Sequence, residues 1–165
     1  MSIAATVLGA CSTSGDPLVP TTVPNPNTTT TPVRPDDGIL SIGVLLPTTG
    51  KGAPLGAPMI AAIEEAVASI NDAGGVLGSD VQLTVRDENA GTGFDELLTE
   101  GVDAIVGPAS SLVALSQLDH AIAPTTGVVT CSPSATALAL DDFPDPNKFF
   151  FRTAPSDSLQ MVAIS

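Results

Sequence analysis

Residues 39–46 read Ile-Leu-Ser-Ile-Gly-Val-Leu-Leu, and Pro47 ends the run. The run is apolar almost without a break, which is typical of a strand buried on both faces of a parallel sheet. A loop of small residues follows at 48–52, and apolar residues then recur at helical spacing over 59–70. A strand, a short loop and an amphipathic helix form the first half of a βαβ unit, so this stretch predicts an α/β fold.

The same order of elements repeats along the rest of the chain. Further strands are expected at 81–86, 102–106, 127–131 and 149–152, with helices at about 94–100, 111–123 and 135–140 and another beginning near Asp157. Strands and helices that alternate with short connections predict a parallel sheet with helices on both faces. In such sheets ligands bind at the carboxyl ends of the strands.

The composition narrows the class of partner. The 165 residues, about the size of one domain, include 18 acidic and 5 basic side chains and carry a net charge of -13. This charge argues against binding to a nucleic-acid backbone, which needs a basic surface. One His and two Cys far apart in the sequence argue against a zinc site, and no metal or other cofactor is expected. No uninterrupted apolar run approaches the roughly 20 residues of a membrane span.

Three loops that follow predicted strands are rich in small and hydroxyl-bearing residues. They cover 47–56, 107–111 and 132–136, and each leads toward a predicted helix. Free backbone N–H groups at a helix start, together with Ser and Thr hydroxyls, can hold a carboxylate without a basic residue. Ser and Thr are also ordinary helix caps, each worth about 1 kcal/mol, so any single loop has a structural explanation. Their occurrence after neighbouring strands favours a shared ligand site.

An enzyme is the main alternative class. The glycines of 50–56 approach a dinucleotide-binding fingerprint, but the spacing to the third Gly is one residue too long. The next acidic residue after a strand, Asp87, also lies much further from Gly50 than the usual spacing of about 20 residues. The one histidine, His120, lies beside Asp119 within a predicted helix, and no Gly-x-Ser-x-Gly motif accompanies it. The chain is therefore predicted not to be an enzyme and no catalytic residue is assigned, with a nucleotide-binding enzyme domain as the less favoured alternative.

The first 38 residues are not expected to belong to the fold. Residues 3–10 are apolar, and Leu-Gly-Ala-Cys at 8–11 resembles a bacterial lipobox, in which the cysteine thiol, here Cys11, takes a lipid chain. A signal peptide begins with a basic segment, and none precedes this run, so 1–11 is interpreted as a truncated signal peptide and lipobox. Residues 12–38 contain six prolines and a run of threonines, which predicts a disordered tether with a reach of roughly 80 Å.

Five stretches in order along residues 39–160 resemble a known family. They lie at 42–47, 70–78, 101–108, 132–136 and 151–157. The set is similar to the periplasmic leucine/isoleucine/valine-binding proteins, which are type I extracellular ligand-binding receptors of ABC transporters. The resemblance implies that 39–165 is the N-terminal ligand-binding lobe of such a protein. It also implies that the lobe is incomplete, because family members continue through a second lobe and then return to the first.

The resemblance also implies roles for individual residues. Ser110 and Ser111 match the loop whose hydroxyl and amide hold the ligand carboxylate. The next loop supplies a backbone carbonyl and a Thr hydroxyl for the ammonium group and a carboxylate oxygen, and its residues here are Ser134, Ala135 and Thr136. Asp157 matches an acidic residue close to the cleft. Leu55 stands where many members place an aromatic side chain, and 89–100 is shorter than the usual helix.

These inferences together predict the substrate-binding component of an ABC transporter. The ligand would be a branched-chain or other amino acid, or a similar small polar solute, bound between lobes and delivered to a membrane permease. The predicted location is outside the cytoplasm, with a lipid anchor at Cys11 on the outer face of the bacterial cytoplasmic membrane. The alternative within the binding class is a ligand-sensing receptor lobe of type I fold, which the lipobox and tether disfavour.

Overall fold

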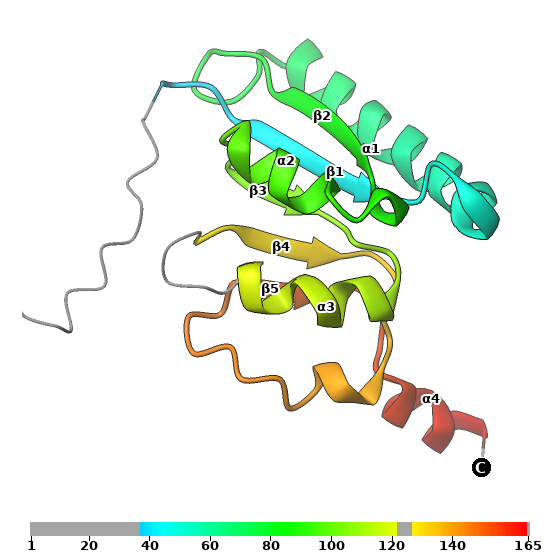
Figure 1. Ribbon diagram of the computed structural model, residues 1–165. Helices are drawn as coiled ribbons and strands as arrows, with labels where there is room; N and C mark the ends of the chain where they lie inside the picture. Colours follow the sequence, from blue (N-terminus) through cyan, green and yellow to red (C-terminus); the bar gives the residue numbers. More distant parts are fainter. Residues whose placement is uncertain (1–36, 122–126, 165) are drawn as a thin grey trace, which may run out of the picture.

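The computed structural model describes residues 37–121 and 127–164. Five strands form one parallel sheet in the order β2-β1-β3-β4-β5. The strands are β1 (Ser41–Leu46), β2 (Gln82–Asp87), β3 (Ala104–Val106), β4 (Val129–Ser132) and β5 (Phe150–Arg152). The helices are α1 (Ala53–Asp72), α2 (Gly93–Thr99), α3 (Ser111–Ala121) and α4 (Asp157–Ile164), with 3-10 turns η1 (Gly50–Gly52), η2 (Glu88–Ala90) and η3 (Leu138–Leu140). Figure 1 shows α1 on one side of the sheet and α2 and α3 on the other, so the predicted architecture is confirmed.

The centre of the core is β1, as its continuous apolar sequence predicts. Val44, Leu45 and Leu46 are fully buried, and β1 pairs with β2 on one side and β3 on the other. On the face covered by α2 and α3, Leu45 packs with Phe94, Leu97, Val102, Ile105, Ala121 and Val128. A second cluster under α3 joins Ala114, Leu118, Ala135 and Leu140. β1 therefore organises the packing under α2, and the residues under α3 form a cluster of their own.

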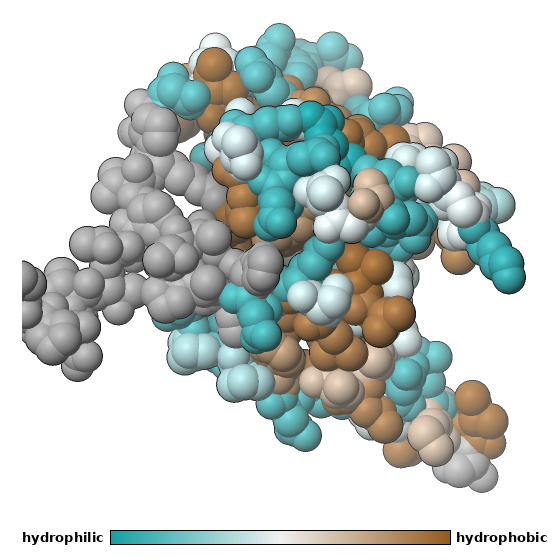
Figure 2. All heavy atoms as spheres, in the orientation of Figure 1, coloured by the Kyte–Doolittle hydropathy of each residue, from teal (hydrophilic) through white to brown (hydrophobic). Residues whose placement is uncertain are grey.

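Among the described residues, α1 covers the opposite face, and much of this helix is exposed. Its buried residues are Gly56 and Val67, while Ile70 remains 40% exposed. The stretch Gly50–Asp72, with a mean hydropathy of 1.3, is long and apolar enough to cross a membrane, but length and composition alone are weak grounds for a span. We assign α1 to the sheet because it packs along β1. Apolar side chains also reach the surface on α4, which projects at the lower right of Figures 1 and 2.

The segment 135–140 differs from the expected helix, because only η3 is helical there. The N–H group of Ala135 donates to the Ser132 hydroxyl, and those of Thr136 and Ala137 donate to the Ser111 hydroxyl. Ala137 has non-helical dihedral angles (φ -52°, ψ 139°), so the helical turn begins only at Leu138. The predicted strand at 102–106 is also shorter, and begins at Ala104. Cys11 and all but the last two residues of the predicted tether lie outside the described residues.

Candidate functional site

The loops that follow β1, β3 and β4 meet at one end of the sheet. These strands are neighbours and run parallel, so their carboxyl ends lie along the same edge. A hollow of about 340 Å³ opens there, and three of the predicted site residues, Leu55, Ser110 and Ser134, line it. The other residues that line it are Pro47, Gly52, Met59, Glu88 and Ala109. The hydroxyl-rich loops thus converge as the sequence predicts.

Two glycines allow this convergence. A side chain at Gly56 would collide with the Pro47 carbonyl, so only glycine lets α1 begin directly against the end of β1. Gly107 has φ +127°, and a Cβ there would collide with the Leu45 carbonyl. The loop after β3 therefore passes closer to β1 than any other residue type would permit.

Hydrogen bonds join the loop after β3 to the loop after β4. The Ser132 hydroxyl donates to the Pro108 carbonyl at 2.5 Å and accepts the Ala135 N–H at 3.0 Å. The Ser134 hydroxyl donates to the Ala109 carbonyl at 2.9 Å. Because Ser132 is fully buried, it fixes both loops from inside the protein. The two loops consequently form one unit beside the hollow.

The remaining predicted residues lie beside the hollow and are not among those that line it. The Ser111 hydroxyl accepts the Thr136 N–H at 3.0 Å and also the N–H of the next residue. Ala135 is fully buried in the cluster under α3. The Asp157 N–H donates to the Thr136 carbonyl at 2.9 Å, which ties the start of α4 to the loop after β4.

Of the two serine hydroxyls in the hollow, that of Ser110 is free to bind a ligand, whereas that of Ser134 already donates to the Ala109 carbonyl. Ser110 is half-buried, and within the described part of the chain its hydroxyl makes no hydrogen bond. Leu55, on the first turn of α1, is 66% exposed and forms an apolar wall. The hollow therefore presents a hydroxyl close to aliphatic side chains.

Glu88 is a site residue that the sequence argument did not identify. It follows β2 directly and is only 5% exposed. Its Oε2 atom accepts the N–H of Ala109 at 2.6 Å and that of Ser110 at 3.3 Å. Burial raises the pKa of Glu88, and these two N–H groups oppose that rise. The one available signal was an acidic residue at a strand end, which alone does not distinguish a buried carboxylate from a solvated one.

The neighbouring Asp87 holds the loop after β1. Its carboxylate accepts the N–H groups of Thr48 and Asn89, both at 3.1 Å, and the hydroxyl of Thr49. The hydroxyl of Thr49, followed by the backbone N–H groups, lowers the pKa of Asp87. The loop that carries Leu55 toward the hollow is therefore attached to the end of β2.

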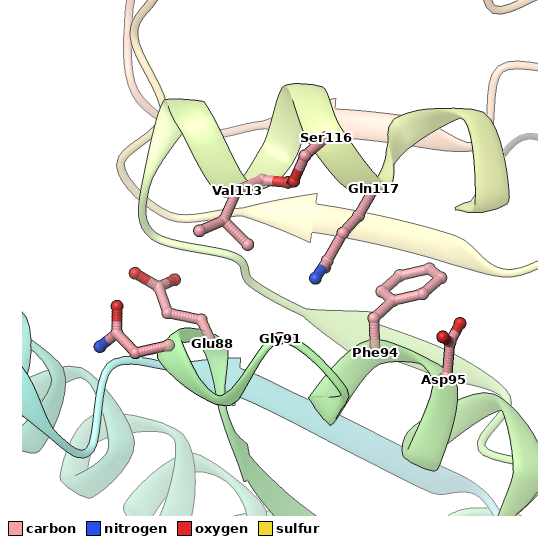
Figure 3. Close-up of a pocket in the computed structure, with 8 residues that line it drawn as sticks. Glu88, Gly91, Phe94, Asp95, Val113, Ser116 and Gln117 are labelled. Atoms are coloured by element: carbon pink, nitrogen blue, oxygen red, sulfur yellow. The ribbon is translucent and has the colours of Figure 1, made fainter.

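A second hollow, of about 360 Å³, lies between α2 and α3 (Figure 3). It is lined by Glu88, Asn89, Gly91, Phe94, Asp95, Val113, Ser116 and Gln117. In Figure 3 the carboxylate of Glu88 points toward the beginning of α3, near Val113. Glu88 thus belongs to the walls of both hollows. Across residues 37–121 and 127–164, no group of three or more His, Cys, Asp and Glu side chains is placed to hold a metal ion.

The family model described as periplasmic binding protein matches residues 40–164. The chain belongs to this family. Its parallel sheet and its solved relatives agree with the type I fold, and the resemblance seen in the sequence is confirmed. Family members bind solutes and are not enzymes, and membership implies a location outside the cytoplasm.

Two curated relatives and one solved structure illustrate the similarity. A chemotactic signal transduction system substrate-binding protein, BasB of Halobacterium salinarum, is 34% identical over 134 residues, covering 76% of this chain and 32% of its own length. The Leu/Ile/Val-binding protein BraC3 of Rhizobium johnstonii is 33% identical over 104 residues, which make up 59% of this chain and 28% of BraC3. Among solved structures, the chain is similar to LivJ of Streptococcus pneumoniae, a branched-chain amino acid transporter substrate-binding protein in complex with isoleucine. The two are 26% identical with a TM-score of 0.60, and the match covers 73% of this chain and 35% of LivJ. The chain thus spans about a third of the length of its curated relatives.

Proposed function

We propose that this chain forms one wall of a cleft that binds an amino acid with an aliphatic side chain and releases it unchanged. The observation that carries the proposal is the hollow at the ends of β1, β3 and β4, which Leu55 and Met59 line together with Ser110 and Ser134. Its apolar part suits a branched aliphatic side chain, and its hydroxyls suit a polar head group. The family and the isoleucine complex of a relative support the same class of ligand.

The residues beside the hollow have secondary roles in this proposal. The Ser110 hydroxyl binds a carboxylate oxygen of the ligand, and Ser111 keeps the neighbouring loop in place. In the loop formed by Ser134, Ala135 and Thr136, the Thr136 hydroxyl binds the head group when a second lobe closes over it, and the buried Ala135 keeps the loop in place. Asp157 is tied to the same loop through the Thr136 carbonyl. Closure of two lobes around a solute is a hinge motion that excludes water from the cleft.

The proposal includes delivery of the solute to an ABC permease at the outer face of the bacterial cytoplasmic membrane. The lipobox-like residues 8–11 support attachment through a lipid on Cys11, and the proline-rich residues 12–38 support a tether to the lobe. A second candidate is sensing, in which the loaded protein contacts a signalling receptor. The relative BasB, which is named as a substrate-binding protein of a chemotactic signal transduction system, supports this second candidate.

Ligand-observed saturation-transfer NMR tests the binding proposal. The wild-type chain is titrated with L-leucine, L-isoleucine, L-valine and, as a comparison, acetate. Ser110→Ala removes a hydroxyl from the proposed cleft, and Ser116→Ala is the matched control because Ser116 lies on the second hollow. We expect the aliphatic amino acids to bind with Kd values in the millimolar range or weaker, since only one wall is described.

The two serine variants distinguish the proposed cleft from the second hollow. The proposal expects Ser110→Ala to weaken amino-acid binding and Ser116→Ala to leave it unchanged. The reverse pattern would place the ligand between α2 and α3, and an absence of saturation transfer to every amino acid would refute the proposed function.

A further inference from the structure

The charge of the proposed cleft comes from one residue. Of the eight described residues that line the hollow, only Glu88 is ionisable. The rest are glycine, proline, serine or apolar residues, and Glu88 itself is 5% exposed. A ligand in the hollow therefore meets one carboxylate, and because Glu88 is buried, its charge is screened less than a charge at an open surface.

The hydrogen bonds of Glu88 leave one of its oxygens available. Both bonds reach Oε2, from the N–H groups of Ala109 and Ser110 at the start of α3. Within the described residues, Oε1 accepts no hydrogen bond, and it is not among the buried atoms that lack a partner. Oε1 is thus the oxygen of this hollow-lining carboxylate that can still accept a hydrogen bond.

The same hydrogen bonds change what the loop can bind. N–H groups at a helix start are an ordinary place for the carboxylate of a ligand. Here the N–H groups of Ala109 and Ser110 already hold the carboxylate of Glu88. After β4, the N–H groups of Ala135 and Thr136 are likewise held by serine hydroxyls. The first lobe has therefore used several of its anion-binding groups internally.

We propose that Glu88 determines the charge class of the ligand, by pairing its Oε1 atom with the ammonium group of an aliphatic amine or amino acid. The aliphatic part of the ligand then contacts Leu55 and Met59, which line the same hollow. This inference rests on the proposed function and adds to it a recognition element for the ammonium group. It also predicts that an aliphatic carboxylate without an amine is rejected, because Glu88 repels it.

A purely structural role for Glu88 makes a different prediction. If Glu88 only fixed the loop after β3, its charge would be irrelevant as long as an acceptor remained. Glu88→Gln separates the two roles, because the amide oxygen can still accept the N–H groups of Ala109 and Ser110. The variant replaces Oε1 with a donor, which favours a carboxylate and disfavours an ammonium group.

The experiment compares three probes of similar shape by saturation-transfer NMR on the whole chain. They are L-leucine, 3-methylbutylamine, which lacks the carboxylate, and 4-methylpentanoate, which lacks the amine. Each is titrated into wild type, Glu88→Gln and Glu64→Gln. The last variant makes the same change in net charge at an exposed position of α1 that does not line the hollow. Backbone amide spectra of all three proteins verify that the fold is kept.

The inference expects wild type and Glu64→Gln to bind L-leucine and the amine more tightly than the carboxylate. In Glu88→Gln, the affinity for the amine should fall by roughly tenfold or more and the preference between amine and carboxylate should shrink or reverse. Equal preference in wild type and a folded Glu88→Gln would overturn the inference while leaving the proposed function intact. If wild type binds none of the three probes, both the proposed function and this inference fail.

Discussion

Substitution of Ser132 by alanine is the most direct test of how the two cleft loops are held together. Ser132 is fully buried, and its hydroxyl bridges the Pro108 carbonyl and the Ala135 N–H. Alanine fits the same space but leaves both backbone groups without that partner. Pro108 and Ala135 are buried as well, so water cannot easily replace the lost hydroxyl.

The expected loss of stability follows from these two groups. A buried donor or acceptor that loses its partner costs about 1–3 kcal/mol, so the loss of both should lower the free energy of unfolding of Ser132→Ala by about 2–6 kcal/mol. That is a large share of the roughly 5–15 kcal/mol that stabilises an ordinary domain. At the middle of these ranges, a loss of about 4 kcal/mol and a urea m value of about 2 kcal/mol per molar, the unfolding midpoint should fall by about 2 M.

Urea unfolding followed by far-UV circular dichroism is the suitable assay, because the chain has no Trp and no Tyr for fluorescence. Ser116→Ala is the control. The exposed hydroxyl of Ser116 donates only to Val113 within the same helix, at 2.9 Å, and its removal should change stability by less than about 0.5 kcal/mol. If the two variants had the same midpoint as wild type, the bridge would not be holding the loops.

Three further outcomes are expected. Leu45→Ala should lower the free energy of unfolding by about 2–5 kcal/mol in the same urea assay, because Leu45 is fully buried at the centre of the sheet. Gly107→Ala should destabilise the chain more than Gly74→Ala, since both have positive φ but only Gly107 lies against backbone; equal midpoints would contradict the proposed close approach. The pKa of Asp87 is lowered in the fold, so its contribution is present above its ordinary value of 3.8 and is lost as pH falls through the lowered value. Urea midpoints measured down to strongly acidic pH should therefore fall less steeply for Asp87→Asn than for wild type, and identical slopes would argue against this role.

The position of the site could be predicted from the sequence because it depends on strand order and direction. A continuous apolar run identified β1 as a central strand, and parallel neighbours bring their carboxyl ends to one edge. Leu55, Ser110 and Ser134 follow different strands, and they line one hollow for this reason.

The details of the site could not be predicted because they depend on contacts between loops. Ser111 lies next to Ser110, but its hydroxyl holds the N–H of Thr136 and so does not face the hollow. Only η3 is helical in the segment 135–140, and the Ser111 hydroxyl, 25 residues before Thr136, holds the N–H groups of Thr136 and Ala137. Glu88 is buried beside the loop after β3, whose N–H groups its carboxylate accepts, and no local sequence pattern reports that contact.

The central claim is that loops at neighbouring strand ends hold a small solute without reacting with it. A titration of the isotope-labelled chain with L-isoleucine, followed in backbone amide spectra, tests this claim most directly. We predict shifts concentrated at 47–56, 87–89, 107–111 and 132–137, with unchanged isoleucine recovered at the end. Shifts confined to α2 and the far part of α3, or the appearance of a product of isoleucine, would contradict the account.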